Sequence, residues 1–102
     1  MQHTAGVPMK REKQTVTIRV HGIVQGVGFR FTARTLANMH GVTGWVANRS
    51  DGSVAIAATG TAEQLAAFRA ALRSSRVGRG IDRWEEECVP VVDAVGGFHI
   101  RD

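Results

Sequence analysis

A glycine-rich segment with one arginine is the part of this sequence best suited to chemistry. Residues 21–30 read HGIVQGVGFR and stand between a run of β-branched residues and a stretch with helical periodicity. Glycines let successive backbone N–H groups turn toward one point, a helix start adds partial positive charge, and a guanidinium group can bind two oxygens at once. A small anion, above all a phosphoryl group, fits such a segment best.

The spacing of these glycines differs from that of the known nucleotide-binding loops. No Gly-Lys-Ser/Thr follows, and Gly26 and Gly28 lack the third glycine of a dinucleotide-binding loop. The residues alone leave a second interpretation open. In it the glycines only shape a strand-to-helix turn, and Arg30 is a solvated surface residue.

Strands and helices on both sides of this loop must hold it in place. The patterns predict a strand over 15–21, a helix over 30–40, strands over 42–49 and 53–58 joined by a turn at 50–52, and strands over 81–88 and 98–101. A second helix is expected to begin after Thr61, with Gln64 completing a capping box, and to end near Ser74. The order predicts an α+β, ferredoxin-like βαββαβ sandwich. Its sheet would be antiparallel, with both helices on one face and a short extra C-terminal strand.

Length and composition indicate one ordinary domain. We expect it over residues 14–102 of the 102, behind a flexible N-terminal tail over residues 1–13. No apolar run approaches the roughly 20 residues that a membrane-spanning helix needs, so we expect a soluble protein with no membrane partner. The single cysteine, Cys88, excludes an internal disulfide and a CxxC metal pair and is typical of a cytoplasmic protein. The formal net charge of +4 is spread along the chain and suits an anionic partner.

Two motifs resemble those of the acylphosphatase family. Residues 21–30 are followed, after a helix-length gap, by residues 44–52, which read GWVANRSDG, and both motifs are similar to the family signature in order and separation. The resemblance covers residues 15–75 well, and toward the C-terminus only residues 97–100 are similar. It implies an acylphosphatase-like domain that hydrolyses the carboxyl–phosphate bond of small-molecule acyl phosphates with neither a metal nor another cofactor.

The resemblance also implies a role for each site residue. Arg30 and Asn48 are the catalytic residues it indicates: Arg30 would bind the non-bridging phosphate oxygens, and Asn48 would orient a water for in-line attack at phosphorus. The acyl chain would project into solvent. The backbone N–H groups that bind phosphate beside the Arg30 side chain would be those of Gln25, Gly26, Val27, Gly28 and Phe29.

This chemistry explains why the sequence contains no recognisable acid–base pair. The leaving group is a carboxylate, whose conjugate acid has a pKa of about 4, so no general acid is needed to expel it. The sequence has no paired carboxylates, Cys/His or Ser/His dyad, or metal-ligating cluster. Phosphoryl transfer needs little beyond positioning and charge stabilisation.

Three other functions stay open at this stage. One is a carbamoyl-phosphate-handling module like that of hydrogenase maturation proteins, although the short chain argues against it. Another is a non-catalytic phosphate-binding module of the same fold. A nucleic-acid-binding module is disfavoured, because the strand over 53–58 offers no aromatic residue for base stacking. We therefore expect a monomer with a small-molecule substrate and no nucleic-acid partner.

The sequence departs from the family pattern in three places. The departures are the small residues Ala55 and Ala57, the apolar segment over 88–96, and Phe31-Thr32 directly after the arginine.

Overall fold

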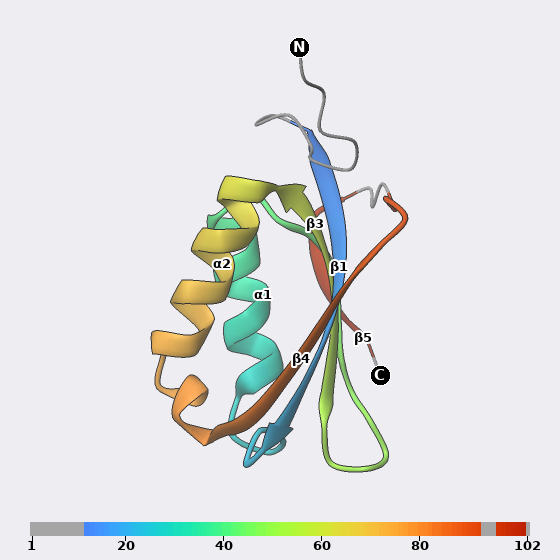
Figure 1. The fold of residues 1–102 in the computed structure, drawn as a ribbon. Coiled ribbons are helices and arrows are strands. Elements are labelled where there is room, and N and C mark those ends of the chain that lie inside the picture. Colours follow the sequence, from blue (N-terminus) through green and yellow to red (C-terminus); the bar gives the residue numbers. More distant parts are fainter. Residues whose placement is uncertain (1–11, 93–95, 102) are drawn as a thin grey trace.

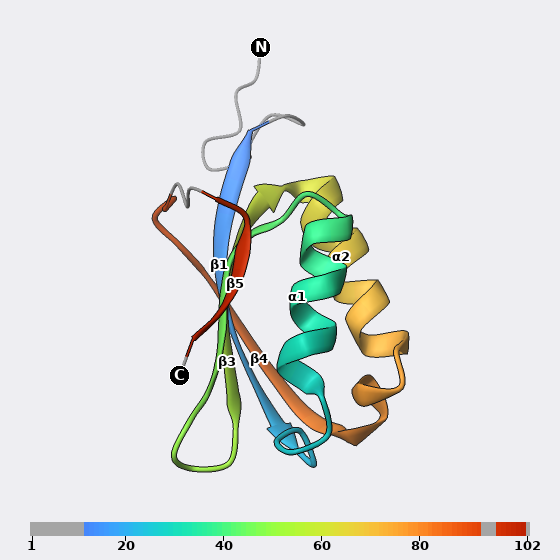
Figure 2. The same ribbon diagram turned by 180° about the vertical axis from the view of Figure 1, so that it is seen from behind.

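The computed structural model describes residues 12–92 and 96–101. Its elements are β1 (Lys13–Gly22), α1 (Phe29–Met39), β2 (Thr43–Asn48), β3 (Val54–Thr61), α2 (Ala62–Ser74), a 3-10 turn η1 (Val77–Gly80), β4 (Ile81–Val89) and β5 (Phe98–Arg101). Figures 1 and 2 show α1 and α2 packed on one face of the sheet, with the other face free of helices. β1 begins at Lys13, inside the stretch predicted as a tail, and residues 1–11 of that stretch lie outside the described residues.

The sheet confirms the predicted ferredoxin-like fold, with one difference in strand direction. Its order is β4-β1-β3-β2-β5, and every neighbouring pair is antiparallel except β2 and β5, which are parallel. β4 and β5 are at opposite edges, so the chain between them must cross the sheet before β5 begins. The backbone N–H of Val92 donates to Oγ1 of Thr15 at 2.8 Å, and Oγ1 of Thr59 donates to the Val92 carbonyl at 2.9 Å. These bonds hold the start of the crossing over the helix-free face.

The core lies between the helices and the sheet. Val16, Ile18 and Val20 of β1 are buried, at 3%, 2% and 0% exposure. The helices contribute their apolar stripes to the same core, namely Phe29, Ala33 and Ala37 from α1 and Leu65, Phe68 and Leu72 from α2. Burial of these faces fixes both helices against the sheet.

The predicted capping box at the start of α2 is confirmed. The backbone N–H of Gln64 donates to Oγ1 of Thr61 at 3.1 Å, and the backbone N–H of Thr61 donates to Oε1 of Gln64 at 2.9 Å. The two bonds satisfy donors that a helix start otherwise leaves unpaired. The start of α1 is built differently, and that difference creates the site.

Candidate active site

The loop between β1 and α1 depends on two glycines in the left-handed region. Gly26 has φ 78° and Gly28 has φ 86°, a conformation that other residues adopt at a cost. Gly28 is the N-cap of α1, no side chain caps this helix, and its first turn contains no acidic residue. The N-terminus of α1 therefore keeps its partial positive charge uncompensated.

The backbone N–H groups of this loop have no acceptor among the residues that the structure describes. Within the described part of the chain, no hydrogen bond has the N–H of any residue from 25 to 30 as its donor. Gly26 and Gly28 are exposed, so the donors of this loop are open to an incoming ligand. A row of free donors at an uncapped helix start is the arrangement that binds phosphate and other anions.

Arg30 follows this row on the first turn of α1. Its side chain is half-buried and makes no hydrogen bond or ion pair with any residue in the ranges 12–92 and 96–101. A guanidinium group carries five donors and is always charged at neutral pH. Its lack of an acidic partner leaves it available to an external anion.

Asn48 is the last residue of β2 and has the same parity as the buried Val46, so it faces the helix layer. Its Oδ1 is buried and has no hydrogen-bond partner among the described residues. Leaving a buried acceptor unpaired costs about 1–3 kcal/mol, which marks the atom as one that a ligand or water would satisfy.

One small hollow brings Arg30 and Asn48 together. It has a volume of about 160 Å³ and is lined by Val24, Gly26, Gly28, Phe29, Arg30, Phe31, Asn48 and Ile100. Figures 1 and 2 show the β1–α1 loop at the same end of the sheet as the β2–β3 turn, which explains how residues of both reach one place. Of the residues expected to bind phosphate, Gln25 and Val27 are not part of this lining.

Gln25 instead joins the loop to the β2–β3 turn. Its Nε2 donates to the carbonyl oxygens of Arg49 at 2.7 Å and Ser53 at 2.8 Å. Asp51 shapes the same turn by accepting from the Ser53 N–H at 2.9 Å and from the Ser53 hydroxyl at 2.5 Å. These two Ser53 bonds hold the pKa of Asp51 below its ordinary value. The side chain of Gln25 thus ties the loop that precedes Arg30 to the turn that follows Asn48.

Three residues near the site were not among those expected to form it. Phe31 and Ile100 line the hollow, and Arg76 donates from Nη2 to the Val27 carbonyl at 3.4 Å, which brings a second guanidinium group to the loop. Phe31 could have been found from its position directly after Arg30. Ile100 and Arg76 are distant in sequence, and no local pattern links them to the loop.

His21 is outside the hollow and pairs across the sheet. Its Nε2 is 2.7 Å from Oε1 of Glu85, and this hydrogen bond holds the pKa of Glu85 below its ordinary value. His21 therefore faces away from the core, toward Glu85 on the neighbouring strand β4.

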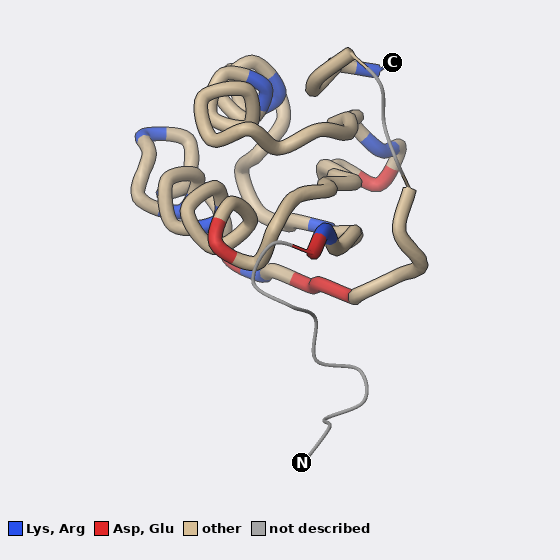
Figure 3. The backbone as a smooth tube through the Cα atoms, turned by 90° about the horizontal axis from the view of Figure 1, so that it is seen from above, with Lys and Arg blue, Asp and Glu red and all other residues tan. Residues whose placement is uncertain are grey.

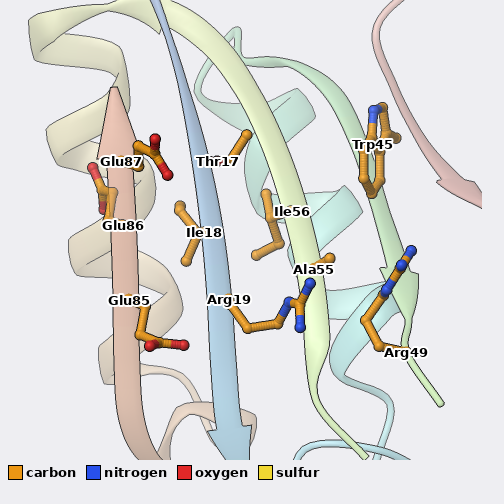
Figure 4. Close-up of a pocket in the computed structure, with 10 residues that line it drawn as sticks. All are labelled: Thr17, Ile18, Arg19, Trp45, Arg49, Ala55, Ile56, Glu85, Glu86 and Glu87. Atoms are coloured by element: carbon orange, nitrogen blue, oxygen red, sulfur yellow. The ribbon is translucent and has the colours of Figure 1, made fainter. Parts of the chain in front are cut away.

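A larger hollow of about 550 Å³ lies on the helix-free face of the sheet. Figure 4 shows Arg19 and Arg49 on either side of Ala55, with Glu85 and Glu87 on β4 and Trp45 on β2. Trp45 lies on this face, and the guanidinium carbon of Arg101 is 4.6 Å from the centre of its ring. The hollow contains neither Arg30 nor Asn48, so it is separate from the loop site.

The charged side chains are spread over the surface (Figure 3). Figure 3 shows Lys and Arg distributed over both helices and the sheet rather than gathered on one face. In residues 12–92 and 96–101, no three His, Cys, Asp or Glu side chains are grouped as metal ligands would be. None of the helices described has the length and apolar character required to cross a bilayer.

Comparison with known proteins places the chain in a family. The acylphosphatase family model matches residues 16–100. An acylphosphatase of Lactobacillus johnsonii is 39% identical over 88 residues, which are 85% of this chain and 97% of the relative.

Solved structures of known proteins also resemble this chain. The crystal structure of acylphosphatase from Bacillus subtilis has a TM-score of 0.77 at 30% identity and covers 87% of this chain and 99% of its own. Full-length HypF in its phosphate- and nucleotide-bound form has a TM-score of 0.83 at 28% identity, with 90% of this chain matched to 12% of HypF. The chain belongs to the acylphosphatase family.

Proposed function

We propose that this acylphosphatase binds the phosphate of an acyl phosphate in the β1–α1 loop and hydrolyses the carboxyl–phosphate bond there. The observation that supports it best is that unpaired groups of three kinds surround one hollow. They are the free loop N–H groups, the half-buried guanidinium of Arg30 and the buried Oδ1 of Asn48. Donors and positive charge suit the phosphate oxygens, and a lone acceptor suits a water.

In the proposed reaction, Oδ1 of Asn48 accepts a hydrogen bond from a water and so directs its oxygen at phosphorus. A bond forms between that oxygen and phosphorus as the bond from phosphorus to the acyl oxygen breaks. The carboxylate leaves without protonation because it is a weak base. The proton lost by the water passes to a phosphate oxygen, since a carboxamide does not accept a proton at neutral pH.

Arg30 and the loop N–H groups would stabilise this transition state electrostatically. Charge on the equatorial phosphate oxygens is met by fixed donors that need no rearrangement during the reaction. The ties from Gln25 to Arg49 and Ser53 support such a preorganised site. We further propose a monomeric, cytoplasmic enzyme whose partner is the small-molecule substrate alone.

A second candidate, left open by the sequence, is a phosphate site that accepts carbamoyl phosphate, and the solved phosphate-bound form of HypF shares this fold. This substrate also joins a carbonyl group to phosphate, so the same loop and Arg30 would bind it. The two candidates differ in the group attached to the carbonyl, and the choice between them is a matter of relative rates.

The test is release of inorganic phosphate from benzoyl phosphate and carbamoyl phosphate by the purified chain, with and without excess chelator. Faster hydrolysis of benzoyl phosphate, unchanged by chelator, is expected. Activity that disappears with chelator would contradict the metal-free mechanism. A preference for carbamoyl phosphate would favour the second candidate, and hydrolysis of neither would leave a phosphate-binding module.

A further inference from the structure

Phe31 is a large apolar side chain left in water beside the anion site. It follows Arg30 on the first turn of α1, is 62% exposed, and lines the same hollow as Arg30 and Asn48. Single exposed apolar residues are common on protein surfaces and are not by themselves evidence of a binding site. The position of this one matters, because any acyl group attached to a phosphate in the hollow must leave it past the lining residues.

The ring of Phe31 is held in place by a neighbour on the same helix. The guanidinium carbon of Arg34 is 4.6 Å from the ring centre, at the i+3 spacing that brings helix side chains together. The contact restrains the ring without covering it, since most of Phe31 remains exposed. A restrained ring loses less conformational freedom when it packs against a ligand.

A second apolar lining residue, Ile100, comes from β5. β5 is fixed to α1, because the backbone N–H of Phe98 donates to Oδ1 of Asn38 at 3.1 Å. The elements that carry Phe31 and Ile100 are therefore held relative to each other. The lining of the hollow thus combines charged and polar groups for the phosphate with apolar groups that a phosphate cannot use.

We propose that Phe31, supported by Ile100, binds the acyl group, and that the preferred substrates are acyl phosphates with an aromatic or bulky apolar acyl group. This inference rests on the proposed function and narrows its substrate class. It replaces the expectation of an acyl chain that projects freely into solvent. An aromatic acyl group would pack against the Phe31 ring, whereas an acetyl group is too small to gain much from it.

The test compares benzoyl phosphate with acetyl phosphate in the wild type and three variants. For Phe31→Ala we expect the ratio of kcat/KM for benzoyl phosphate to that for acetyl phosphate to fall about 5- to 10-fold, the size of one aromatic contact. Phe31→Tyr keeps the ring and is expected to hold the ratio within about twofold. Met39→Ala removes a similarly exposed apolar side chain, 68% exposed, at the other end of α1. This variant should leave kcat/KM for both substrates unchanged.

A second measurement separates acyl binding from damage to the loop. Inorganic phosphate has no acyl group, so its inhibition constant should be the same in Phe31→Ala as in the wild type. A ratio that Phe31→Ala leaves unchanged overturns the inference while the proposed function stands. Equal loss with both substrates, together with weaker inhibition by phosphate, also overturns it, because Phe31 would then support the loop. A wild type that hydrolyses neither substrate removes the proposed function itself.

Discussion

Asn48 and Arg30 come from different layers of the fold and line one hollow, and neither side chain has a hydrogen-bond partner in the described part of the protein. One offers a buried acceptor and the other a half-buried, permanently charged donor. Folding leaves the buried acceptor of Asn48 unsatisfied, which is costly, and leaves the guanidinium group of Arg30 without an acidic partner among the described residues. Their joint satisfaction by a phosphate and a water is the simplest reason for this arrangement.

Replacing Arg30 with Gln should reduce both affinity and turnover. The variant loses the one charged group among the described residues that line the hollow, so kcat/KM for benzoyl phosphate is expected to fall about 100- to 1,000-fold. Arg73→Gln on α2 is the matched control, because Arg73 stacks on Trp84, at 4.1 Å from the ring centre, away from the loop. Similar losses in the two variants would mean that net charge, rather than Arg30, matters.

Replacing Asn48 with Ala should reduce turnover and leave the other properties of the protein nearly intact. Because Oδ1 has no partner among the described residues, its removal breaks no hydrogen bond seen there, and the urea midpoint should stay close to that of the wild type. We expect kcat to fall about 100-fold while KM changes little. Near-normal hydrolysis of benzoyl phosphate by this variant would refute the water-orienting role.

Replacing Gln25 with Leu tests the link between the loop and the β2–β3 turn. Two hydrogen bonds, at 2.7 and 2.8 Å, disappear and two carbonyl oxygens lose their donor. The expected loss is roughly 1–3 kcal/mol in the free energy of unfolding, together with a lower kcat/KM because the loop is less well positioned. Denaturant unfolding and kinetics on the same sample would check both effects, and normal kinetics in a destabilised variant would limit Gln25 to a structural role.

Inorganic phosphate should stabilise the fold, because it satisfies donors that are free without it. At a phosphate concentration 100 times its Kd the gain is about 2.7 kcal/mol, which raises Tm by roughly 10–20 °C in a domain of this size. The measurement is thermal unfolding against phosphate concentration, with sodium chloride at equal ionic strength as the control. In Arg30→Gln the increase in Tm should be smaller at the same phosphate concentration. An increase equal to that of the wild type would mean that phosphate binds at a site without Arg30.

Replacing Gly44 with Ala tests how closely the backbones of β2 and β3 approach each other, and Gly52→Ala serves as the comparison. It has φ 135°, and an added Cβ would be 1.9 Å from the Ala57 carbonyl oxygen, so Gly44→Ala must move backbone. Gly52 in the β2–β3 turn has φ 91° with no atom within 4 Å of an added Cβ, so Gly52→Ala carries the conformational cost alone. We expect a loss of about 1 kcal/mol for Gly52→Ala and about 3 kcal/mol or more for Gly44→Ala, by urea unfolding. Equal losses would show that the close approach is relieved without cost.

Local patterns were enough to predict most of the fold, whereas the centre of the site was predicted from the resemblance to the acylphosphatase family. Strict alternation specified β1, and the Thr61 and Gln64 pair specified the start of α2, because each depends on interactions between near neighbours. Arg30 and Asn48 were found through two motifs, and the structure brings them into one hollow. Their chemical roles stay predictions until the variants are measured.

The features missed depend on contacts between distant residues. The chain after β4 starts over the helix-free face, where Val92 is bonded to Thr15 and Thr59, and β5 then pairs with β2 in parallel. No local sequence pattern indicates that these two threonines make such contacts. Ile100 reaches the site only because β5 adds beside β2. Nothing in the loop sequence says that the Gln25 side chain bonds to the β2–β3 turn rather than facing the anion.

The parallel addition of β5 also decides which strands form the borders of the sheet. Without it, β2 would present a row of unpaired N–H and C=O groups, and such an edge is a template for joining other chains in aggregates. With β5 in place, the strand that carries Asn48 is interior, and the border strands are the four-residue β5 and the charge-rich β4. Shortness and charge are both known deterrents to edge-to-edge association, so this last strand shields the strand that completes the site from self-association.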